Sequence, residues 1–203
     1  LGPIIYTHTL AEDDDQIGLV TGLAYTKVGG DILFIEVANM PGVGKVTLTG
    51  QLGDVMKESA KAAYTYVRSH CELLGIKATT IAKTDIHVHV PEGAVPKDGP
   101  SAGLAITTAI ISSFTKKPVP KDLAMTGEVT LRGRALEIGG VREKVVAAHR
   151  AGIKKLILPK DNEKNLEDIP ENVRKDLEFH FVRNMDEVVS IVFNSPLSKG
   201  EAA

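Results

Sequence analysis

The chain has 203 residues, 43% of them hydrophobic and 25% charged, with a formal net charge of -2 at pH 7. That length suffices for one well-buried domain, and the near-neutral charge gives no reason to expect nucleic acid or a membrane as a partner. With no run of roughly 18 apolar residues, the sequence predicts no membrane-spanning segment, and we expect no signal peptide. The single cysteine, Cys71, excludes an internal disulfide and fits the reducing cytoplasm.

The two ends of the chain are expected to lie outside the folded domain. Because the first residue is Leu1 rather than Met, we expect the chain to be part of a longer protein. We predict an N-terminal extension over residues 1–17, in which the acidic run from Glu12 to Asp15 forms a solvated loop. We predict one domain over residues 18–194 and a flexible tail over residues 195–203.

An antiparallel hairpin is predicted first, from two apolar runs separated by a glycine pair. The runs cover residues 19–27 and 32–38, and Gly29-Gly30 allows a tight turn between them. A short strand is predicted at residues 46–49.

The turn before that strand superficially matches a phosphate-binding loop. It contains Gly42-Val43-Gly44-Lys45, but Asn39 stands where the P-loop pattern needs its first glycine, and Val46 where it needs Ser or Thr. We therefore predict a tight turn and no nucleotide site.

A long amphipathic helix is predicted over residues 53–74, ended by Gly75. Its apolar positions recur at spacings of four and three: Met56, Ala60, Ala63, Val67, Cys71 and Leu74. Cys71 is thus predicted to be a core residue rather than a reactive thiol.

The next predicted strand, residues 85–90, places Asp85, His87 and His89 on one face. A His-x-His pair can chelate zinc, but no third ligand follows at a recognisable spacing, so no metal is predicted. His87 stays a candidate for shaping a nearby pocket or hydrogen-bonding there.

A Gly- and Pro-rich segment, residues 96–103, places Ser101 at the N-terminus of a predicted helix that is apolar on nearly all sides. Free N–H groups and the positive end of a helix stabilise negative charge, either on an oxyanion or on a phosphate. Pro100 has no N–H, so the local candidate donors are the amides of Gly99, Ser101 and Ala102. Asp98 is expected to hold this loop or to tune the charge around it.

A second informative helix follows a strand that runs through Thr126. It is predicted over residues 139–152, opened by two glycines and stopped by Gly152. Lys144 lies inside its apolar arc, which is formed by Val141, Val145, Ala148 and Ala151. Burial disfavours an ammonium ion and lowers the pKa of the amine, and the neutral amine that results is a general base.

The remaining segments complete an alternation of strands and helices. Strands are predicted at residues 155–158 and 178–182, with helical turns at 162–168 and a helix at 186–193. The fold class is therefore α/β, with a mixed sheet and βαβ units.

Ser101 and Lys144 together predict nucleophilic catalysis of acyl transfer, with a Ser-Lys pair in place of Ser-His-Asp. Each has a plainer interpretation. Ser101 can be a helix cap, and Lys144 can extend its charge past the helix edge into water. The sequence does not itself bring the two together.

These motifs resemble those of the Lon family of ATP-dependent serine proteases. The resemblance covers residues 18–193 and rests on three blocks in the same order: Pro91-Glu92-Gly93-Ala94 with Pro96-Lys97-Asp98-Gly99-Pro100-Ser101-Ala102-Gly103, then residues 124–133, and the Lys144 helix. It implies a fold like that of the Lon protease domain. It also implies that Ser101 is the nucleophile, Lys144 its base and Thr126 the hydroxyl that orients the amine.

The resemblance has wider implications for partners. Lon proteases carry an AAA+ ATPase that unfolds substrates, and no such module is in this chain, so ATP and Mg are expected only for that module and no cofactor for this chain. Unfolded proteins or peptides are the implied substrates. A homohexameric ring is the implied assembly.

Two other function classes remain open at this point. GHMP kinases resemble the Lon proteolytic fold and use a glycine-rich loop for ATP, in which case Lys144 would be a charged, solvated phosphate ligand. A non-catalytic assembly domain is the other alternative, in which Ser101 and Lys144 have no chemical role.

Overall fold

The structure is a computed structural model that describes residues 15–27, 29–91 and 97–194. Most of the predicted acidic loop, part of the segment before Ser101 and the predicted C-terminal tail therefore lie outside the described residues.

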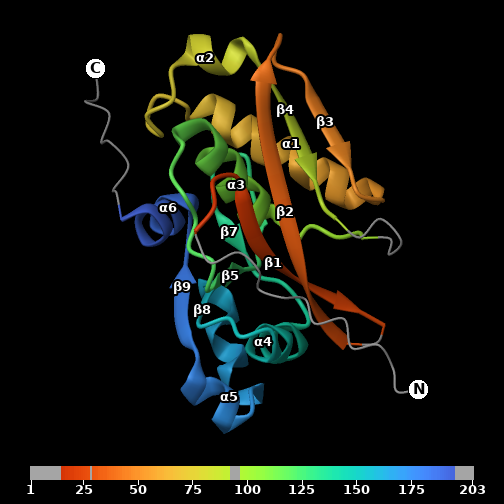
Figure 1. Cartoon of the computed structure of the whole chain (residues 1–203). Coiled ribbons are helices and arrows are strands. Elements are labelled where there is room, and N and C mark those ends of the chain that lie inside the picture. The colour runs from red at the N-terminus through yellow and green to blue at the C-terminus, as the bar shows by residue number, and fades with distance from the viewer. Residues whose placement is uncertain (1–14, 28, 92–96, 195–203) are drawn as a thin grey trace.

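A mixed seven-stranded sheet runs through the molecule (Figure 1). Its strands, in spatial order, are β3 (Val46–Thr49), β4 (Thr84–His89), β2 (Gly29–Pro41), β1 (Leu19–Thr26), β5 (Leu123–Met125), β8 (Lys155–Pro159) and β9 (Glu178–Val182). β2 is antiparallel to both β1 and β4, and the other neighbours are parallel. The predicted α/β class with a mixed sheet is confirmed.

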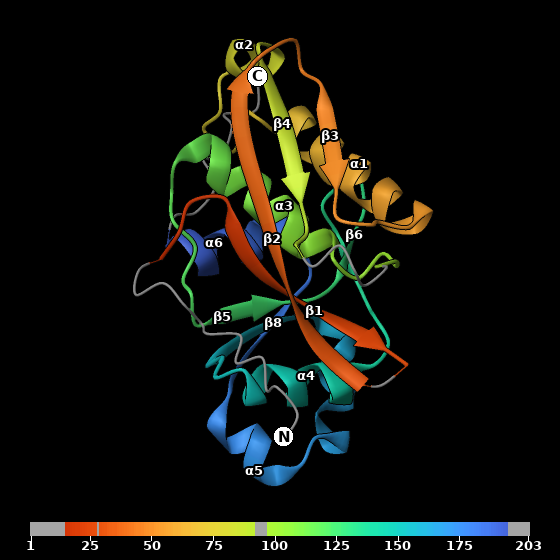
Figure 2. The same ribbon diagram turned by 45° about the vertical axis from the view of Figure 1, so that its right-hand side comes forward.

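The first hairpin forms as predicted, with a longer second strand. β1 pairs with β2 from Leu19 opposite Glu36 to Thr26 opposite Gly29. β2 continues to Pro41 because its second half pairs with β4 instead of β1. One long strand thus joins the two halves of the sheet, as the turned view in Figure 2 also shows.

Helices cover both faces of this sheet. They are α1 (Asp54–Ser69), α2 (Ala78–Ala82), α3 (Gly103–Thr115), α4 (Val141–Arg150), the 3-10 helix η1 (Lys160–Asp168), α5 (Glu171–Asp176) and α6 (Met185–Phe193). Because successive side chains of a strand point to opposite faces, Met125 packs with α1, α3 and α6 while Ala124 packs with α4 and α5. None of the helices in the described part of the chain is long and apolar enough to cross a bilayer.

α3 is buried along almost its whole length, as its composition predicts. It carries two threonines into the core, and each satisfies its hydroxyl within the helix. Thr107 donates to the carbonyl of Gly103 at 2.7 Å, and Thr108 to that of Leu104 at 2.8 Å. Hydroxyl groups can therefore be buried on this helix without losing their hydrogen bonds.

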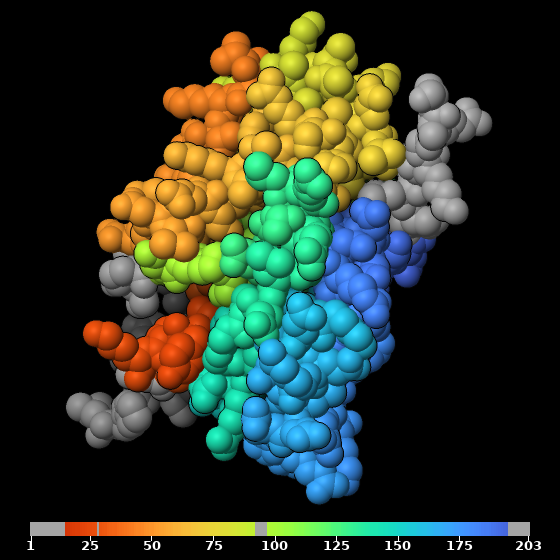
Figure 3. All heavy atoms as spheres, turned by 180° about the vertical axis from the view of Figure 1, so that it is seen from behind, coloured from red at the N-terminus to blue at the C-terminus, as the bar shows by residue number. Residues whose placement is uncertain are grey.

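Three short elements are absent from the sequence prediction, because each is too short for a periodic pattern. They are α2, α5 and the hairpin of β6 (Glu128–Val129) and β7 (Ala135–Leu136). Seen from behind, the segment that holds this hairpin lies between the α1 half of the molecule and the C-terminal half (Figure 3).

α1 ends at Ser69 rather than Leu74, so its predicted end is wrong. A chain of turns follows, in which Leu74 donates to the carbonyl of His70 and Ile76 to that of Cys71. Cys71 and Leu74 are still buried, so the apolar spacing correctly predicts burial beyond the last helical residue.

Candidate active site

Ser101 lies in a turn one residue before Ala102, the N-cap of α3. Its carbonyl oxygen accepts two hydrogen bonds from the segment that follows β5, from the Gly127 N–H at 2.8 Å and from the Thr126 hydroxyl at 3.2 Å. The Leu104 N–H donates back to the Gly127 carbonyl at 3.0 Å. The turn is thereby fixed to the centre of the sheet, since β5 lies between β1 and β8.

Lys144 lies on the buried side of α4, as the helical arc predicts, with 2% of its surface exposed. Its Nζ donates to the Thr126 hydroxyl oxygen at 3.2 Å. Burial lowers the pKa of the Lys144 amine to about 8, because water no longer stabilises the ammonium form. The plainer interpretation, in which the charge extends into solvent, is therefore wrong.

Thr126 connects the two candidate residues. It is fully buried directly after β5, and its N–H donates to the Ile157 carbonyl at 3.2 Å. Its hydroxyl accepts from Lys144 and donates to the carbonyl of Ser101. One side chain thus contacts both the amine and the turn that carries the serine.

Ser101 and Lys144 line the same cavity of about 140 Å³. Much of its wall is apolar, formed by Leu23, Ile32, Leu33 and Phe34 of the hairpin and by Met56 of α1. The remainder includes the segment before α3, which contributes Lys97, Asp98, Gly99 and Ala102. The structure therefore brings together two residues that the sequence leaves 43 positions apart.

Asp98 holds this segment to α1. Its Oδ1 accepts from the Met56 N–H at 2.9 Å, inside the first turn of α1, and from its own neighbour Gly99 at 2.9 Å. The N-cap of α1 is Gly53, which has no side chain to offer, so Asp98 supplies the cap from a distant segment. A Cβ on Gly53 would lie 2.3 Å from Asp98 Cγ, so glycine is needed for this approach.

One of the three candidate oxyanion donors already has a hydrogen-bond partner. The Gly99 N–H donates to Asp98 Oδ1 at 2.9 Å. The amides of Ser101 and Ala102 are the candidates that remain.

Two residues contribute to the site without any signal in the sequence motifs. Met56, which helical spacing marks only as a core residue, lines the cavity, and its N–H binds Asp98. Lys97 is buried, and its Nζ donates to the Gly50 carbonyl at 3.2 Å. No local pattern signals either contact, because both depend on segments that meet only in the fold.

His87 is not among the described residues that line the cavity. Its Nε2 and the Nδ1 of His89 both contact the Thr49 hydroxyl, at 2.8 and 2.6 Å. The described residues include no group of three His, Cys, Asp or Glu side chains that could hold a metal ion.

The glycine-containing turn before β3 binds a carboxylate of the chain itself. Asp85 Oδ1 accepts from the N–H groups of Val43 and Lys45 at 2.7 and 2.8 Å. These backbone hydrogen bonds lower the pKa of the Asp85 carboxyl. The tight-turn prediction is confirmed, and the amides that would cradle a phosphate are already occupied.

Comparison with known proteins shows the family to which the chain belongs. The profile of the Lon protease C-terminal proteolytic domain matches residues 1–195. The chain belongs to the Lon protease family. Lon proteases that it resembles include those of Brevibacillus choshinensis, 59% identical over 189 residues, and Desulforamulus reducens, 56% identical over 191 residues. Lon protease 1 of Bacillus subtilis is 58% identical over 189 residues.

The match covers 93% to 94% of this chain and 24% of the length of each of these relatives. It therefore confirms the resemblance that the motifs indicate and identifies the chain with the proteolytic part of Lon. Lys144, which the kinase alternative needs as a solvated phosphate ligand, is buried in this chain.

Proposed function

We propose that the chain is the serine endopeptidase domain of an ATP-dependent protease, with Ser101 as nucleophile and Lys144 as general base. The observation that carries this proposal is the buried Lys144 amine, held by Thr126 in the cavity that Ser101 also lines. With a pKa of about 8, roughly a tenth of the amines are neutral at pH 7, far more than for an exposed lysine.

The reaction then proceeds through an acyl-enzyme. Neutral Lys144 accepts the Ser101 hydroxyl proton as the oxygen attacks a peptide carbonyl. The C–N bond breaks, the ammonium of Lys144 returns the proton to the leaving amine, and the acyl group stays on Ser101. Water, deprotonated by the same amine, releases the new carboxylic acid and the free serine.

The start of α3 is suited to the negative charge of the tetrahedral intermediate. The N–H groups of Ser101 and Ala102 lie at the positive end of a buried helix, where removal from water strengthens a hydrogen bond. Thr126 has a different role in this proposal, because its hydroxyl orients the amine of Lys144 toward the nucleophile.

The apolar cavity wall favours unfolded polypeptides as substrates. Side chains such as Leu23, Leu33 and Phe34 bind apolar residues without demanding one particular shape. Damaged or unfolded proteins and short-lived regulatory proteins expose such residues.

The proposal includes partners outside the chain. An AAA+ ATPase module of the longer protein unfolds substrates with ATP and Mg, and this domain needs no cofactor of its own. Six copies form a ring around a shared chamber, in the cytoplasm, with neither nucleic acid nor a membrane as partner of this domain.

A peptidyl boronate, which forms a tetrahedral adduct with an activated serine, tests the proposal. We expect the probe to modify Ser101 in the wild-type chain, and neither the Ser101→Ala nor the Lys144→Ala variant to react. Tight ATP binding by the chain without any adduct at Ser101 would instead support the kinase-like alternative.

A further inference from the structure

The segment that leads into α4 has little support from regular structure. β7 ends at Leu136, and Glu137 to Gly139 follow before Gly140, which has a left-handed φ of 67° and serves as the N-cap without a side-chain hydrogen bond. Lys144 begins its helical hydrogen bonding here, because its N–H donates to the Gly140 carbonyl at 3.0 Å. The position of the first turn of α4 thus depends in part on what holds these few residues.

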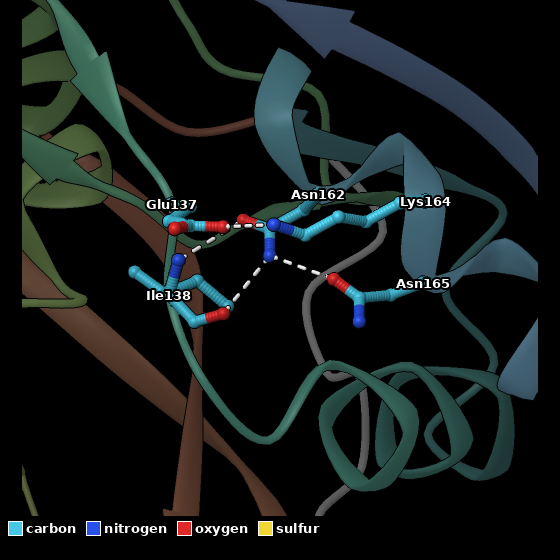
Figure 4. A network of polar contacts seen from close by, with 5 residues as sticks. All are labelled: Glu137, Ile138, Asn162, Lys164 and Asn165. Atoms are coloured by element: carbon cyan, nitrogen blue, oxygen red, sulfur yellow. Dashed lines mark hydrogen bonds and ion pairs between the residues drawn. The ribbon is translucent and has the colours of Figure 1, made fainter.

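Asn162 of η1 holds them as a neighbouring strand would (Figure 4). Its Oδ1 accepts from the Ile138 N–H at 3.0 Å, and its Nδ2 donates to the Ile138 carbonyl at 2.9 Å. A single carboxamide therefore binds both backbone groups of one residue, which is what a paired strand provides.

The orientation of this carboxamide is fixed. Asn162 is 2% exposed, and its Nδ2 also donates to Asn165 Oδ1 at 3.0 Å, so both amide hydrogens are used. Rotating the carboxamide by 180° would place its NH₂ group against the Ile138 N–H and its oxygen against the Ile138 carbonyl. Replacing it with a carboxylate would place an oxygen against the Ile138 carbonyl oxygen in a buried site.

The same stretch of chain also holds Thr126. Ile157 of β8 accepts a hydrogen bond from the Thr126 N–H, and five residues later Asn162 binds Ile138. The contact between Thr126 and Lys144 joins two segments that are both attached to this stretch. Residues 157–162 therefore act as a common frame for the amine and for the hydroxyl that it contacts.

We propose that Asn162 is a positioning residue, which fixes the start of α4 and so keeps the Lys144 amine against Thr126 and out of water. This inference rests on the proposed function for its effect on catalysis, and on the hydrogen bonds alone for its effect on the amine. The charged groups that share the cavity with Lys144 are Asp31, Lys97 and Asp98, and none of them contacts Asn162 through a hydrogen bond that the described residues make.

The first experiment measures peptide cleavage by the full-length protein carrying Asn162→Ala, with Asn162→Ser as the milder variant if the alanine protein does not fold. We expect kcat to fall by about tenfold or more with KM within about twofold, since misplacing a catalytic group costs rate rather than binding. The pH at which kcat reaches half its maximum should also rise, because water that reaches Lys144 restores its ordinary basicity.

Glu137→Gln is the matched control. Glu137 and Lys164 form an exposed ion pair with a distance of 2.7 Å, beside the Asn162–Ile138 contact (Figure 4). The substitution removes this ion pair. Exposed pairs contribute little, so kcat and the pH midpoint should both stay at their wild-type values. A purely structural role for Asn162 would lower the unfolding free energy and leave the pH midpoint of the remaining folded protein unchanged.

A second measurement does not need activity. The titration of Lys144, followed by NMR of its side-chain methylene carbons, should move to higher pH in the Asn162 variant and not in Glu137→Gln. Unchanged titration and unchanged kcat in a folded Asn162 variant would overturn the inference. If wild-type Ser101 fails to react with the boronate while the titration still moves, the proposed function fails and the positioning role stands.

Discussion

The two sides of the cavity are held in place by different physical means. Lys144 belongs to a regular helix that is positioned mainly by burial, since Val141, Val145 and Ala148 pack into the core beneath β5 and β8. Directed hydrogen bonds between Asn162 and Ile138 hold the residues before its start. Ser101 belongs to a turn whose position is set by hydrogen bonds from Thr126, Gly127 and, through Asp98, the start of α1. The hydrophobic effect is non-directional, whereas a hydrogen bond weakens steeply when its donor and acceptor move apart or lose their alignment.

This difference predicts that the lysine side keeps its stability when a buried side chain is replaced by another of similar shape. The serine side is expected to be sensitive even to a small displacement, because moving its turn breaks several directed hydrogen bonds at once. Substitutions on each side can therefore separate catalysis from stability.

The largest effect is expected from Lys144→Met, which replaces the amine with an apolar side chain of similar length. We expect kcat to fall by at least about a thousandfold, because the group proposed to accept the serine proton is removed. The unfolding free energy, measured with urea, should not decrease, since the cost of burying a polar amine disappears. Arg142→Met on the exposed side of α4 is the control and should leave both quantities unchanged. Turnover by Lys144→Met would rule out the lysine base.

The pH dependence of kcat reports on the same side of the cavity. In the proposed mechanism the active form is the neutral amine, whose pKa burial lowers to about 8, so activity should be lost as the pH falls through that value. Between roughly pH 6 and pH 9 the neutral fraction rises by about a hundredfold, and a stopped-flow or fluorogenic assay should follow it. A flat profile over this range would show that some other group takes the proton.

The same contrast decides how much could be predicted from the sequence. The burial of Lys144 follows from helical periodicity, and the hairpin, β3 and β9 from local patterns, so these predictions are confirmed. Three contacts could not be predicted. The capping of α1 by Asp98 and the hydrogen bond from Ile138 to Asn162 join segments that lie far apart in the chain. The hydrogen bond from the Gly99 N–H to Asp98 depends on the local backbone conformation.

Adding one methyl group at Gly53, outside the cavity, should displace the turn that carries Ser101. Gly53→Ala would place a Cβ 2.3 Å from Asp98 Cγ, although the φ of Gly53, -71°, suits alanine. Asp98 must then leave the Met56 N–H, so α1 loses its cap and the turn before Ser101 shifts. We expect kcat/KM to fall by about tenfold and the unfolding free energy by about 1 kcal/mol.

Gly139→Ala is the control for this methyl group, because the space around Gly139 is open. It should change neither quantity by more than the error of the assay. Wild-type kcat/KM in Gly53→Ala would mean that the hydrogen bonds of Asp98 do not set the position of the serine turn.

The smallest effect is expected from His87→Ala, which lies on neither side of the cavity. His87 contacts the Thr49 hydroxyl, and His89 contacts the same oxygen, so the hydroxyl keeps a partner when His87 is removed. Turnover should stay within about twofold of the wild-type value and the unfolding free energy within about 0.5 kcal/mol. Thr49→Val removes both contacts and should cost more stability than His87→Ala, again with little change in kcat. A large loss of kcat in His87→Ala alone would instead place the imidazole in the reaction, because the loss of one of two equivalent contacts to Thr49 cannot produce it.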